Sequence, residues 1–242
     1  MILITRPKTE SKNLQKQLNE FGIQSFVEPL TSFKFLDRTI KYNKDAIYIC
    51  ASQRTVEAII QSKSKSLLSA NFIVVGESVK VLMYKKKFSS ILYTADESKQ
   101  LIKWMCKKNN KMQHYIYLGG SIVNNDFINN LKLHKIQYKR KIIYQTLKKK
   151  DFSFKFLQNL RQKKIMSVIF FSKTNAKQYF ELLKKNKMHS YSKDQIFFCL
   201  SHRIAEFLKK QKIPTYLIQI PRNPKLTSMI NLLKSKKLLI NQ

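Results

Sequence analysis

Small or hydroxyl-bearing residues follow several apolar, β-like runs of this sequence, and each of them also opens a helix-like pattern. Ser52, Ser172 and Ser201 are three such residues. A helix that starts there directs unpaired backbone N–H groups and the positive end of its dipole outward, which suits anions such as carboxylates. Helix capping alone explains any single serine. The repetition at many strand ends is what predicts an anion-binding site.

The candidate binding residues lie at the ends of apolar runs or carry a positive charge near one. They are Arg6, Ser52, Gln53, Gly76, Ser78, Gly120, Ser121, Ser172, Lys173, Ser201 and Arg222. Motifs for other chemistry are missing from the sequence. It has no GxGxxG or GxxxxGK(S/T) nucleotide loop, no histidine pair with metal-ligand spacing and no arguable Ser-His-Asp set. These residues would therefore bind and shape an anion without a metal or a nucleophile.

Alternating β-like and helix-like segments must position these residues. Leu14, Leu18 and Phe21 have helical spacing, Thr9 is a candidate N-cap for their helix, and Gly22 fits its C-terminal stop. The β-like runs are 1–5, 23–27, 46–51, 72–75, 90–94, 114–118, 135–144, 167–171, 196–200 and 215–219. Strands that alternate with helices predict parallel sheets in an α/β fold.

The order of these segments repeats once along the chain. Segment A is 1–28 and matches 114–141, segment B is 49–59 and matches 169–180, and segment C is 74–102 and matches 198–228. Matched positions keep a constant offset within each pair, as for Leu18 with Leu131 and for Gly76 with Ser201. The resulting order A-B-C-A-B-C predicts a duplication.

Two arrangements satisfy this order. The two halves could fold one after the other, or the middle B-C-A could form one domain while the first A and the last B-C form the second. The β-like segments near 29–36 and 141–148 fall at the two crossings of the second arrangement. There they would pair as a two-stranded link, with Tyr144 and Gln145 on the returning strand.

The net charge of +33 first suggests nucleic acid, because basic surfaces attract phosphates. However, 40 of the 47 basic residues are lysines (47 − 7 arginines), they are spread over most helix-like segments, and base recognition favours arginine. Codons rich in A and T also explain an abundance of Lys, Asn and Ile. Either origin of the charge would attract an acidic substrate.

Length, apolar pattern and cysteines narrow the class of protein further. A chain of 242 residues can form one large domain or two small ones. It has no apolar run of the roughly 20 residues that cross a bilayer, and its N-terminus lacks the features of a signal peptide. The three cysteines are far apart and odd in number. We therefore expect free thiols, a cytoplasmic location and no membrane partner.

Short motifs in a fixed order resemble the uroporphyrinogen-III synthase family. They are Thr5-Arg6-Pro7, the segment Pro29 to Phe33, the segment Ala51 to Val56, the turn Val75 to Val79, the pair Tyr144-Gln145 and the strand end at Ser172. Together they cover nearly the whole chain. The sequence departs from the family pattern at Ala51, Val79 and Gly119, where the family has Thr, Thr and Arg. These departures affect side-chain roles but leave backbone contacts possible.

The resemblance implies two similar flavodoxin-like α/β domains with parallel sheets, joined by a two-stranded β-ladder. The first domain is discontinuous, 1–31 with 149–242, and the inserted second domain is 32–148. The resemblance also implies the reaction, in which hydroxymethylbilane is cyclised to uroporphyrinogen III with loss of water and inversion of the last pyrrole ring. It implies a lyase without a cofactor, and it makes Tyr144 the candidate catalytic residue that assists loss of the hydroxyl.

The expected partner is therefore a small polycarboxylate, with transient contact to the preceding synthase of the pathway and a ligand bound between the domains. We expect a monomer that binds no specific nucleic acid. Two other interpretations stay open: a basic nucleic-acid-binding α/β protein, and a non-catalytic small-molecule-binding module of the same fold.

Overall fold

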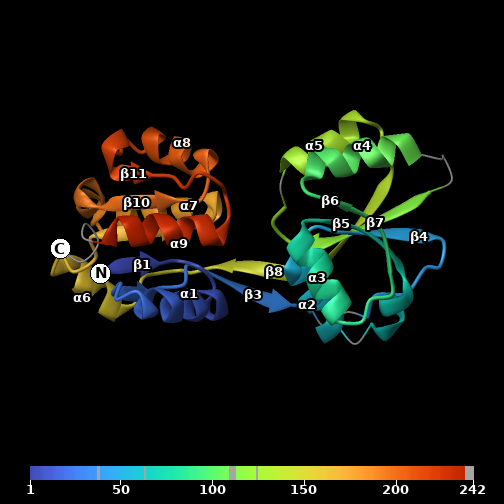
Figure 1. Ribbon diagram of the computed structural model, residues 1–242, viewed down its shortest axis with the longest axis horizontal. Helices are drawn as coiled ribbons and strands as arrows, with labels where there is room; N and C mark the ends of the chain where they lie inside the picture. Colours follow the sequence, from blue (N-terminus) through green and yellow to red (C-terminus); the bar gives the residue numbers. More distant parts are fainter. Residues whose placement is uncertain (37–38, 63, 109–112, 124, 238–242) are drawn as a thin grey trace. The chain divides into compact units, whose positions relative to one another are not determined.

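The chain forms two compact units that are built from different parts of the sequence. The computed structural model describes residues 1–36, 39–62, 64–108, 113–123 and 125–237. Unit 1 consists of Met1–Ser32 and Leu147–Gln242, and unit 2 consists of Phe33–Thr146 (Figure 1). No helix in the described parts of the chain is long and apolar enough to cross a membrane.

Unit 1 is a parallel sheet between two layers of helices. Its strands run in the order β11-β10-β9-β1-β2. They are β1 (Ile2–Ile4), β2 (Ser25–Val27), β9 (Ser167–Phe170), β10 (Ile196–Cys199) and β11 (Ile218–Gln219). Helices α1 (Lys8–Glu20) and α9 (Leu226–Ser235) pack on one face. Helices α6 (Phe154–Arg161), α7 (Lys173–Lys185) and α8 (His202–Lys210) pack on the other. Both faces of the strands are covered, which explains why they read as continuous apolar runs.

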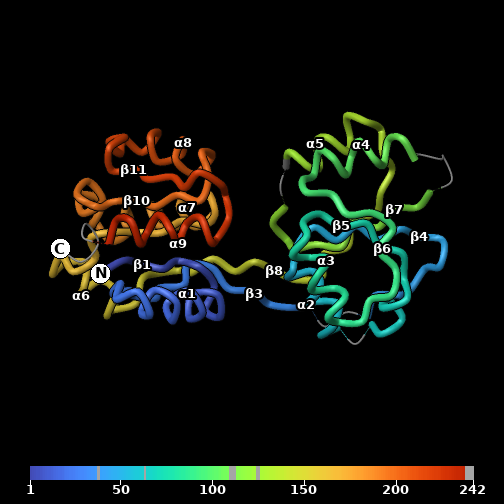
Figure 2. Tube along the Cα trace, in the orientation of Figure 1, coloured from blue at the N-terminus to red at the C-terminus, as the bar shows by residue number. Residues whose placement is uncertain are grey.

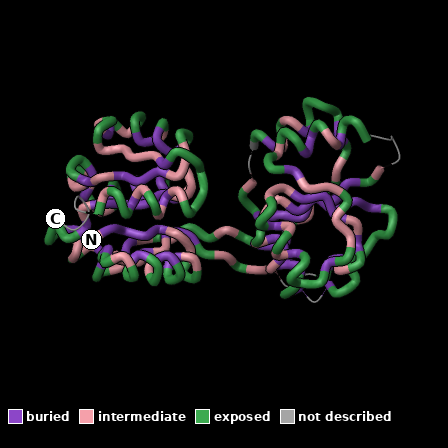
Figure 3. The backbone as a smooth tube through the Cα atoms, in the orientation of Figure 1, coloured by how far each residue is buried: buried purple, intermediate pink, exposed green. Residues whose placement is uncertain are grey.

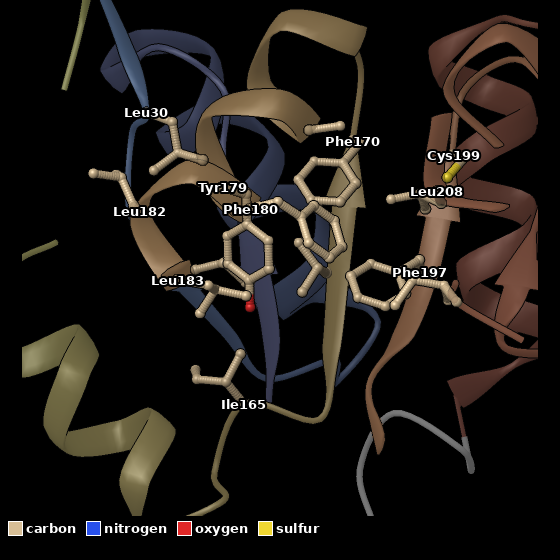
Figure 4. Close-up of a cluster of buried hydrophobic side chains, with 14 of the residues drawn as sticks. Leu30, Ile165, Phe170, Tyr179, Phe180, Leu182, Leu183, Phe197, Cys199 and Leu208 are labelled. Carbon is tan, nitrogen blue, oxygen red and sulfur yellow. The ribbon is translucent and has the colours of Figure 1, made fainter. Parts of the chain in front are cut away.

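Aromatic rings fill much of the core beneath α7 and α8. Phe170 and Phe197 stack with ring centroids 5.9 Å apart, and Tyr179 meets Phe170 edge-on at 5.5 Å. Figure 4 shows these rings together with Phe180 and Leu208. The Tyr179 hydroxyl donates to Gln195 Oε1 at 2.7 Å, so this buried tyrosine leaves no polar atom unpaired.

Unit 2 contains a second parallel sheet, to which one further strand is added at its edge. The order is β3-β8-β7-β4-β5-β6. The strands are β3 (Thr31–Phe35), β4 (Ala46–Cys50), β5 (Asn71–Val75), β6 (Ser90–Ala95), β7 (His114–Gly120) and β8 (Tyr138–Lys148). Helices α2 (Gln53–Gln61) and α3 (Glu77–Lys85) cover one face, and α4 (Ser98–Lys108) and α5 (Asn125–Leu133) cover the other. One short 3-10 helix, Lys65–Ser69, lies in unit 2, and two more, His189–Asp194 and Thr215–Leu217, lie in unit 1.

The two sheets have the same spatial arrangement although the chain enters them at different points. In the A-B-C notation, unit 1 has the order β2-β1 from A, β9 from B and β10-β11 from C. Unit 2 has β8-β7 from A, β4 from B and β5-β6 from C. The predicted fold class of two similar parallel α/β units is therefore confirmed. In each unit the central strands are buried along most of their length, whereas the edge strands are partly exposed and the helices keep an exposed outer face (Figure 3).

The chain leaves unit 1 within β3 and returns within β8 (Figure 2). The two strands are neighbours, and their hydrogen bonds join Leu36 N to Ile143 O and Lys149 N to Leu30 O. The residue numbers of both pairs add to 179, so the strands are antiparallel. Glu28, which is 3% exposed, accepts from Lys149 Nζ at 2.6 Å and thereby fixes the returning strand in unit 1. A two-stranded antiparallel link is thus present between the units.

Local details differ from the sequence predictions in three places. Thr9 is not an N-cap, because α1 already begins at Lys8 and Pro7 occupies the N-cap position without a side-chain cap. The run 215–219 becomes a strand only at Ile218, and the run 135–144 becomes a strand only at Tyr138 and then continues to Lys148. The predicted end of the first helix at Gly22 is confirmed. Gly22 has a φ of +66°, and its N–H donates a hydrogen bond to Asn19 O.

Candidate functional site

In each sheet, two central neighbouring strands send the chain to opposite faces and towards opposite edges of the sheet. In unit 1, β1 continues into α1 on one face, while its neighbour β9 continues into α7 on the other. In unit 2, β7 leads to α5 and its neighbour β4 leads to α2, again on opposite faces. In open parallel sheets the crevice at such a switch point, beyond the carboxyl ends of the strands, is where ligands bind. Each unit therefore has a candidate site at the carboxyl edge of its sheet.

At the carboxyl edge of unit 1, the predicted residues follow adjacent strands. Ser172 follows β9 and caps α7, with its Oγ accepting from Asn175 N at 3.2 Å. Ser201 follows β10 and occupies the N-cap of α8, but its hydroxyl makes no capping bond. Arg6 follows β1, and its guanidinium carbon lies 4.4 Å from the centre of the Phe171 ring. These positions bring two helix N-termini and a cation to one edge.

The remaining predicted residues of unit 1 extend this edge. Lys173 is the first residue of α7, next to the Ser172 cap. Arg222 follows β11 by three residues and is exposed. Both add positive charge on the side where the helix dipoles are already favourable for anions.

At the carboxyl edge of unit 2, Ser52 is the N-cap of α2 and its Oγ accepts from Thr55 N at 3.2 Å. Gln53 begins that helix, and its side-chain amide donates to Ser78 O at 3.2 Å, which ties α2 to α3. Ser78 is itself exposed. Gly76 is the N-cap of α3 with φ of +97°. Its N–H donates to Ala95 O at 2.7 Å, so this N–H is not available to a ligand.

Ser121 differs from the prediction in a similar way. Its backbone N–H donates to Tyr144 O at 2.9 Å, and its Oγ accepts from Thr146 N at 3.1 Å. Both bonds join the end of β7 to β8. Ser121 is exposed, so its own hydroxyl proton remains for a ligand while its backbone N–H is used within the protein.

Tyr144 brings three of the predicted residues together. It pairs with Gly120 in the β7–β8 register, and its hydroxyl lies 3.3 Å from Ser52 Oγ. A Cβ at Gly120 would lie 2.4 Å from Tyr144 Cε2, so only glycine leaves room for the ring. Phe33 packs edge-on against the ring at 5.8 Å, and Tyr144 is 8% exposed. Gly120 therefore acts by giving space, and Tyr144 is held rigidly beside the α2 N-terminus.

Sequence reasoning missed two residues of this region. Thr55 is buried, and its Oγ1 lies 3.1 Å from Ser52 Oγ and donates to Leu118 O at 3.3 Å. Arg140 Nη2 donates to Gly120 O at 2.6 Å and to Ser121 O at 3.1 Å. Arg140 was marked only by its rarity, since the chain has few arginines among many lysines.

Cys50 lies directly beneath this edge at the end of β4. Burial raises the pKa of its thiol to about 12, so the thiol is protonated near neutral pH. It donates weakly to Ser52 O at 3.6 Å. A protonated, buried thiol is inert, which leaves hydroxyls, helix N-termini and guanidinium groups as the chemistry of the site.

A family model for the uroporphyrinogen-III synthase HemD matches residues 12–231. The chain is similar to the solved uroporphyrinogen-III synthetase of Helicobacter pylori, with a TM-score of 0.65 and 16% identity over 87% of this chain and 92% of that chain. It is also similar to a mutant uroporphyrinogen III synthase of the extremely thermophilic bacterium Thermus thermophilus, with a TM-score of 0.60 and 9% identity over 99% of both chains. No curated protein sequence matches the chain significantly.

Proposed function

The chain belongs to the uroporphyrinogen-III synthase family of haem biosynthesis, and we propose that it works there as a hydro-lyase that needs no cofactor. The reaction cyclises hydroxymethylbilane to uroporphyrinogen III. It removes the terminal hydroxyl as water and inverts the last pyrrole ring. Closure without an enzyme gives the other isomer, so the protein must control which carbon attacks. Holding a flexible substrate in a reactive geometry can lower a barrier by about 7–11 kcal/mol at best.

The observation that supports this proposal is that both units present the same kind of edge. In each, a serine caps a helix at the switch point of a parallel sheet, as Ser52 and Ser172 do. Helix N-termini bind carboxylates through backbone N–H groups and the helix dipole. Hydroxymethylbilane is a linear tetrapyrrole with eight carboxylates, so it offers anions along its whole length. Many weak donors suit such a substrate better than one strong site.

We further propose that Tyr144 assists the departure of the hydroxyl group. Hydroxide is a poor leaving group, and a hydrogen bond from a phenol to its oxygen lowers the barrier as the bond to carbon breaks. The Tyr144 hydroxyl is within 3.3 Å of Ser52 Oγ, which can accept or donate and so can orient it. The tight packing of the ring against Gly120 fixes where that hydroxyl lies.

The test is to incubate the protein with hydroxymethylbilane generated by the preceding synthase, and to resolve the type III and type I isomers after oxidation. We expect predominantly type III in the presence of the protein and type I in a control without it. Type I at the uncatalysed rate would contradict the proposal. Slowed formation of type I, with no type III, would instead identify a non-catalytic module that sequesters the substrate.

The setting of the reaction is part of the same proposal. We propose a cytoplasmic monomer that receives its unstable substrate from the preceding synthase by transient contact. Two of the three cysteines, Cys50 and Cys199, are buried as free thiols, which is compatible with a reducing compartment. Size-exclusion chromatography with light scattering would check the monomer directly.

A further inference from the structure

A second tyrosine lies at the same switch point as Tyr144 but on the opposite face of the sheet. Tyr117 is in β7, whose side chains alternate between the two faces. Its ring packs in the core under α4 and α5, whereas Tyr144 packs in the core under α2 and α3. None of the motifs in the sequence singled it out. Tyr117 therefore borders the candidate site on the face of the sheet that α4 and α5 cover, whereas Tyr144 borders it on the face that α2 and α3 cover.

The neighbouring glycine decides where the Tyr117 hydroxyl lies. A Cβ built at Gly119 would be 3.2 Å from Tyr117 Cζ and 3.3 Å from its hydroxyl oxygen, so the ring lies along the strand towards its carboxyl end. The absence of a side chain at Gly119 gives the ring this space. Phe127 from α5 packs edge-on against it with centroids 5.3 Å apart. Two consecutive glycines thus seat two tyrosines, Gly119 for Tyr117 and Gly120 for Tyr144.

Among the residues that the structure describes, the Tyr117 hydroxyl has no hydrogen-bond acceptor, although the residue is only 8% exposed. Burial, with a smaller effect from nearby Tyr144, raises the pKa of Tyr117 to about 12 although Arg140 opposes the rise. The phenol therefore keeps its proton near neutral pH and can donate it in a hydrogen bond. A buried ring with a donor at the ligand edge is well placed to contact a bound anion.

Arg140 supplies a positive charge beside this hydroxyl. It pairs with Tyr117 in the register between β7 and β8, so both side chains start from the same face of the sheet. Its two bonds from Nη2 to Gly120 O and Ser121 O hold the guanidinium at the carboxyl end of β7. Arg140 is exposed, and among the described residues its Nη1 and Nε groups make no hydrogen bond. These N–H groups can reach a ligand.

We propose that the Tyr117 hydroxyl and the Arg140 guanidinium together bind one carboxylate of the substrate at the carboxyl end of β7. The inference rests on the proposed function, because it assigns one of the carboxylates of that substrate. A carboxylate accepts from both groups at once, and hydrogen bonds that involve ionised partners are the strong ones. Both groups are anchored before binding, Arg140 by two carbonyls and Tyr117 by Gly119 and Phe127. The subsite holds substrate and plays no part in breaking the bond to the hydroxyl.

The test compares Tyr117→Phe with a matched control on the same strand and face. Tyr115 is two residues earlier, and its hydroxyl donates to Gln113 Oε1 at 2.6 Å, away from the carboxyl end. Tyr117→Phe should raise KM about tenfold with kcat within about twofold, because it removes one hydrogen bond to a charged group. Tyr115→Phe should leave KM unchanged. Arg140→Lys should also raise KM, since it loses the forked geometry while keeping the charge.

A double variant separates a hydroxyl effect from a packing effect. Gly119→Ala should displace the ring by a few tenths of an ångström and raise KM on its own. Added to Tyr117→Phe, it should raise KM little further, because both changes act through the same hydroxyl. Thermal unfolding of every variant checks that the fold persists.

The outcomes separate this inference from the proposed function. Failure of the unaltered protein to form type III isomer would overturn both. An active protein in which the Tyr117→Phe and Tyr115→Phe variants have the same KM would overturn only the carboxylate subsite. A large fall in kcat at constant KM for Tyr117→Phe would also overturn it, because the residue would then act in the chemical step.

Discussion

Tyr144 is held as a catalytic donor would need to be held, with its ring locked over Gly120 and its hydroxyl beside Ser52. We expect Tyr144→Phe to lower the rate of type III formation about a hundredfold, since positioned acid assistance is typically worth that much or more. Substrate affinity and stability should change little, because the ring and its packing are kept. Steady-state turnover beside thermal unfolding of both proteins is the measurement.

A small effect of Tyr144→Phe on turnover would contradict the catalytic assignment. Turnover within about threefold of the unaltered protein corresponds to less than about 1 kcal/mol of barrier. Tyr144 would then be a packing residue of β8, and the catalytic assignment would be wrong. The neighbouring Lys148, which is largely exposed and pairs with Glu181, serves as a control because exposed charges are screened by salt.

Residue positions were predictable where the signal is local, and were missed where it depends on strand pairing. Ser52 and Ser172 could be identified because a hydroxyl directly after an apolar run marks a strand end and a helix cap together. Arg140 could not, since it reaches Gly120 only through the register between β7 and β8. Gly76 and Gly120 were placed at the right edge, but their packing and backbone bonds, set by the whole sheet, determine what they do there.

At the scale of helices, the chain uses lysine where glycine is the usual residue. Five lysines have positive φ, namely Lys87, Lys135, Lys163, Lys187 and Lys212. Each follows the end of a helix. Its N–H and the N–H of the next residue donate to carbonyls in the last turn of that helix, as the N–H groups of Gly22 and Ile23 do after α1. After α7, for example, Lys187 N–H donates to Lys184 O and Met188 N–H donates to Leu183 O. This C-terminal motif favours glycine, which reaches the left-handed region without a steric penalty.

The left-handed lysines make a specific stability prediction. Lys187→Gly should stabilise unit 1 by about 0.5–1 kcal/mol, because the relief of the left-handed backbone exceeds the added entropy of the unfolded chain. Lys177→Gly, at an exposed position inside the same helix, should destabilise it by about 1 kcal/mol. Urea unfolding of the two variants measures the difference. Destabilisation of similar size by both would show that the φ of Lys187 carries no cost.

The segment order predicted a duplication but left two domain arrangements open and predicted no strand order. The structure shows that matching A, B and C segments occupy matching places in the two sheets, which depends on pairing between strands that are far apart in the sequence. The predicted helix start at Thr9 was wrong, because α1 begins at Lys8 and the Pro7 carbonyl already accepts a hydrogen bond from Ser11 N–H.

At the scale of the whole molecule, the charge of +33 is the feature most open to a second interpretation. We expect binding to nucleic acid to be weak and to fall steeply with salt, as phosphate neutralisation by lysines does. Filter binding or fluorescence anisotropy with duplexes of different sequence, between roughly 50 and 300 mM salt, is the measurement. Sequence-selective binding that survives physiological salt, about 0.15 M, would favour a nucleic-acid-binding protein instead.

The division into domains makes the last prediction, since the family resemblance implies an inserted domain at 32–148. All buried side chains of the two cores of unit 2 come from residues 40–144, so the segment carries a complete core of its own. The described residues 1–28, in contrast, supply β1 and β2, and β1 pairs with β9 from far along the chain. A fragment 32–148 should therefore fold alone, whereas deletion of 1–28 should unfold unit 1, because it removes a central strand. Circular dichroism and cooperative urea unfolding of both fragments measure this. A fragment 32–148 without a cooperative transition would mean that unit 2 depends on unit 1, and the predicted domain boundaries would then be wrong.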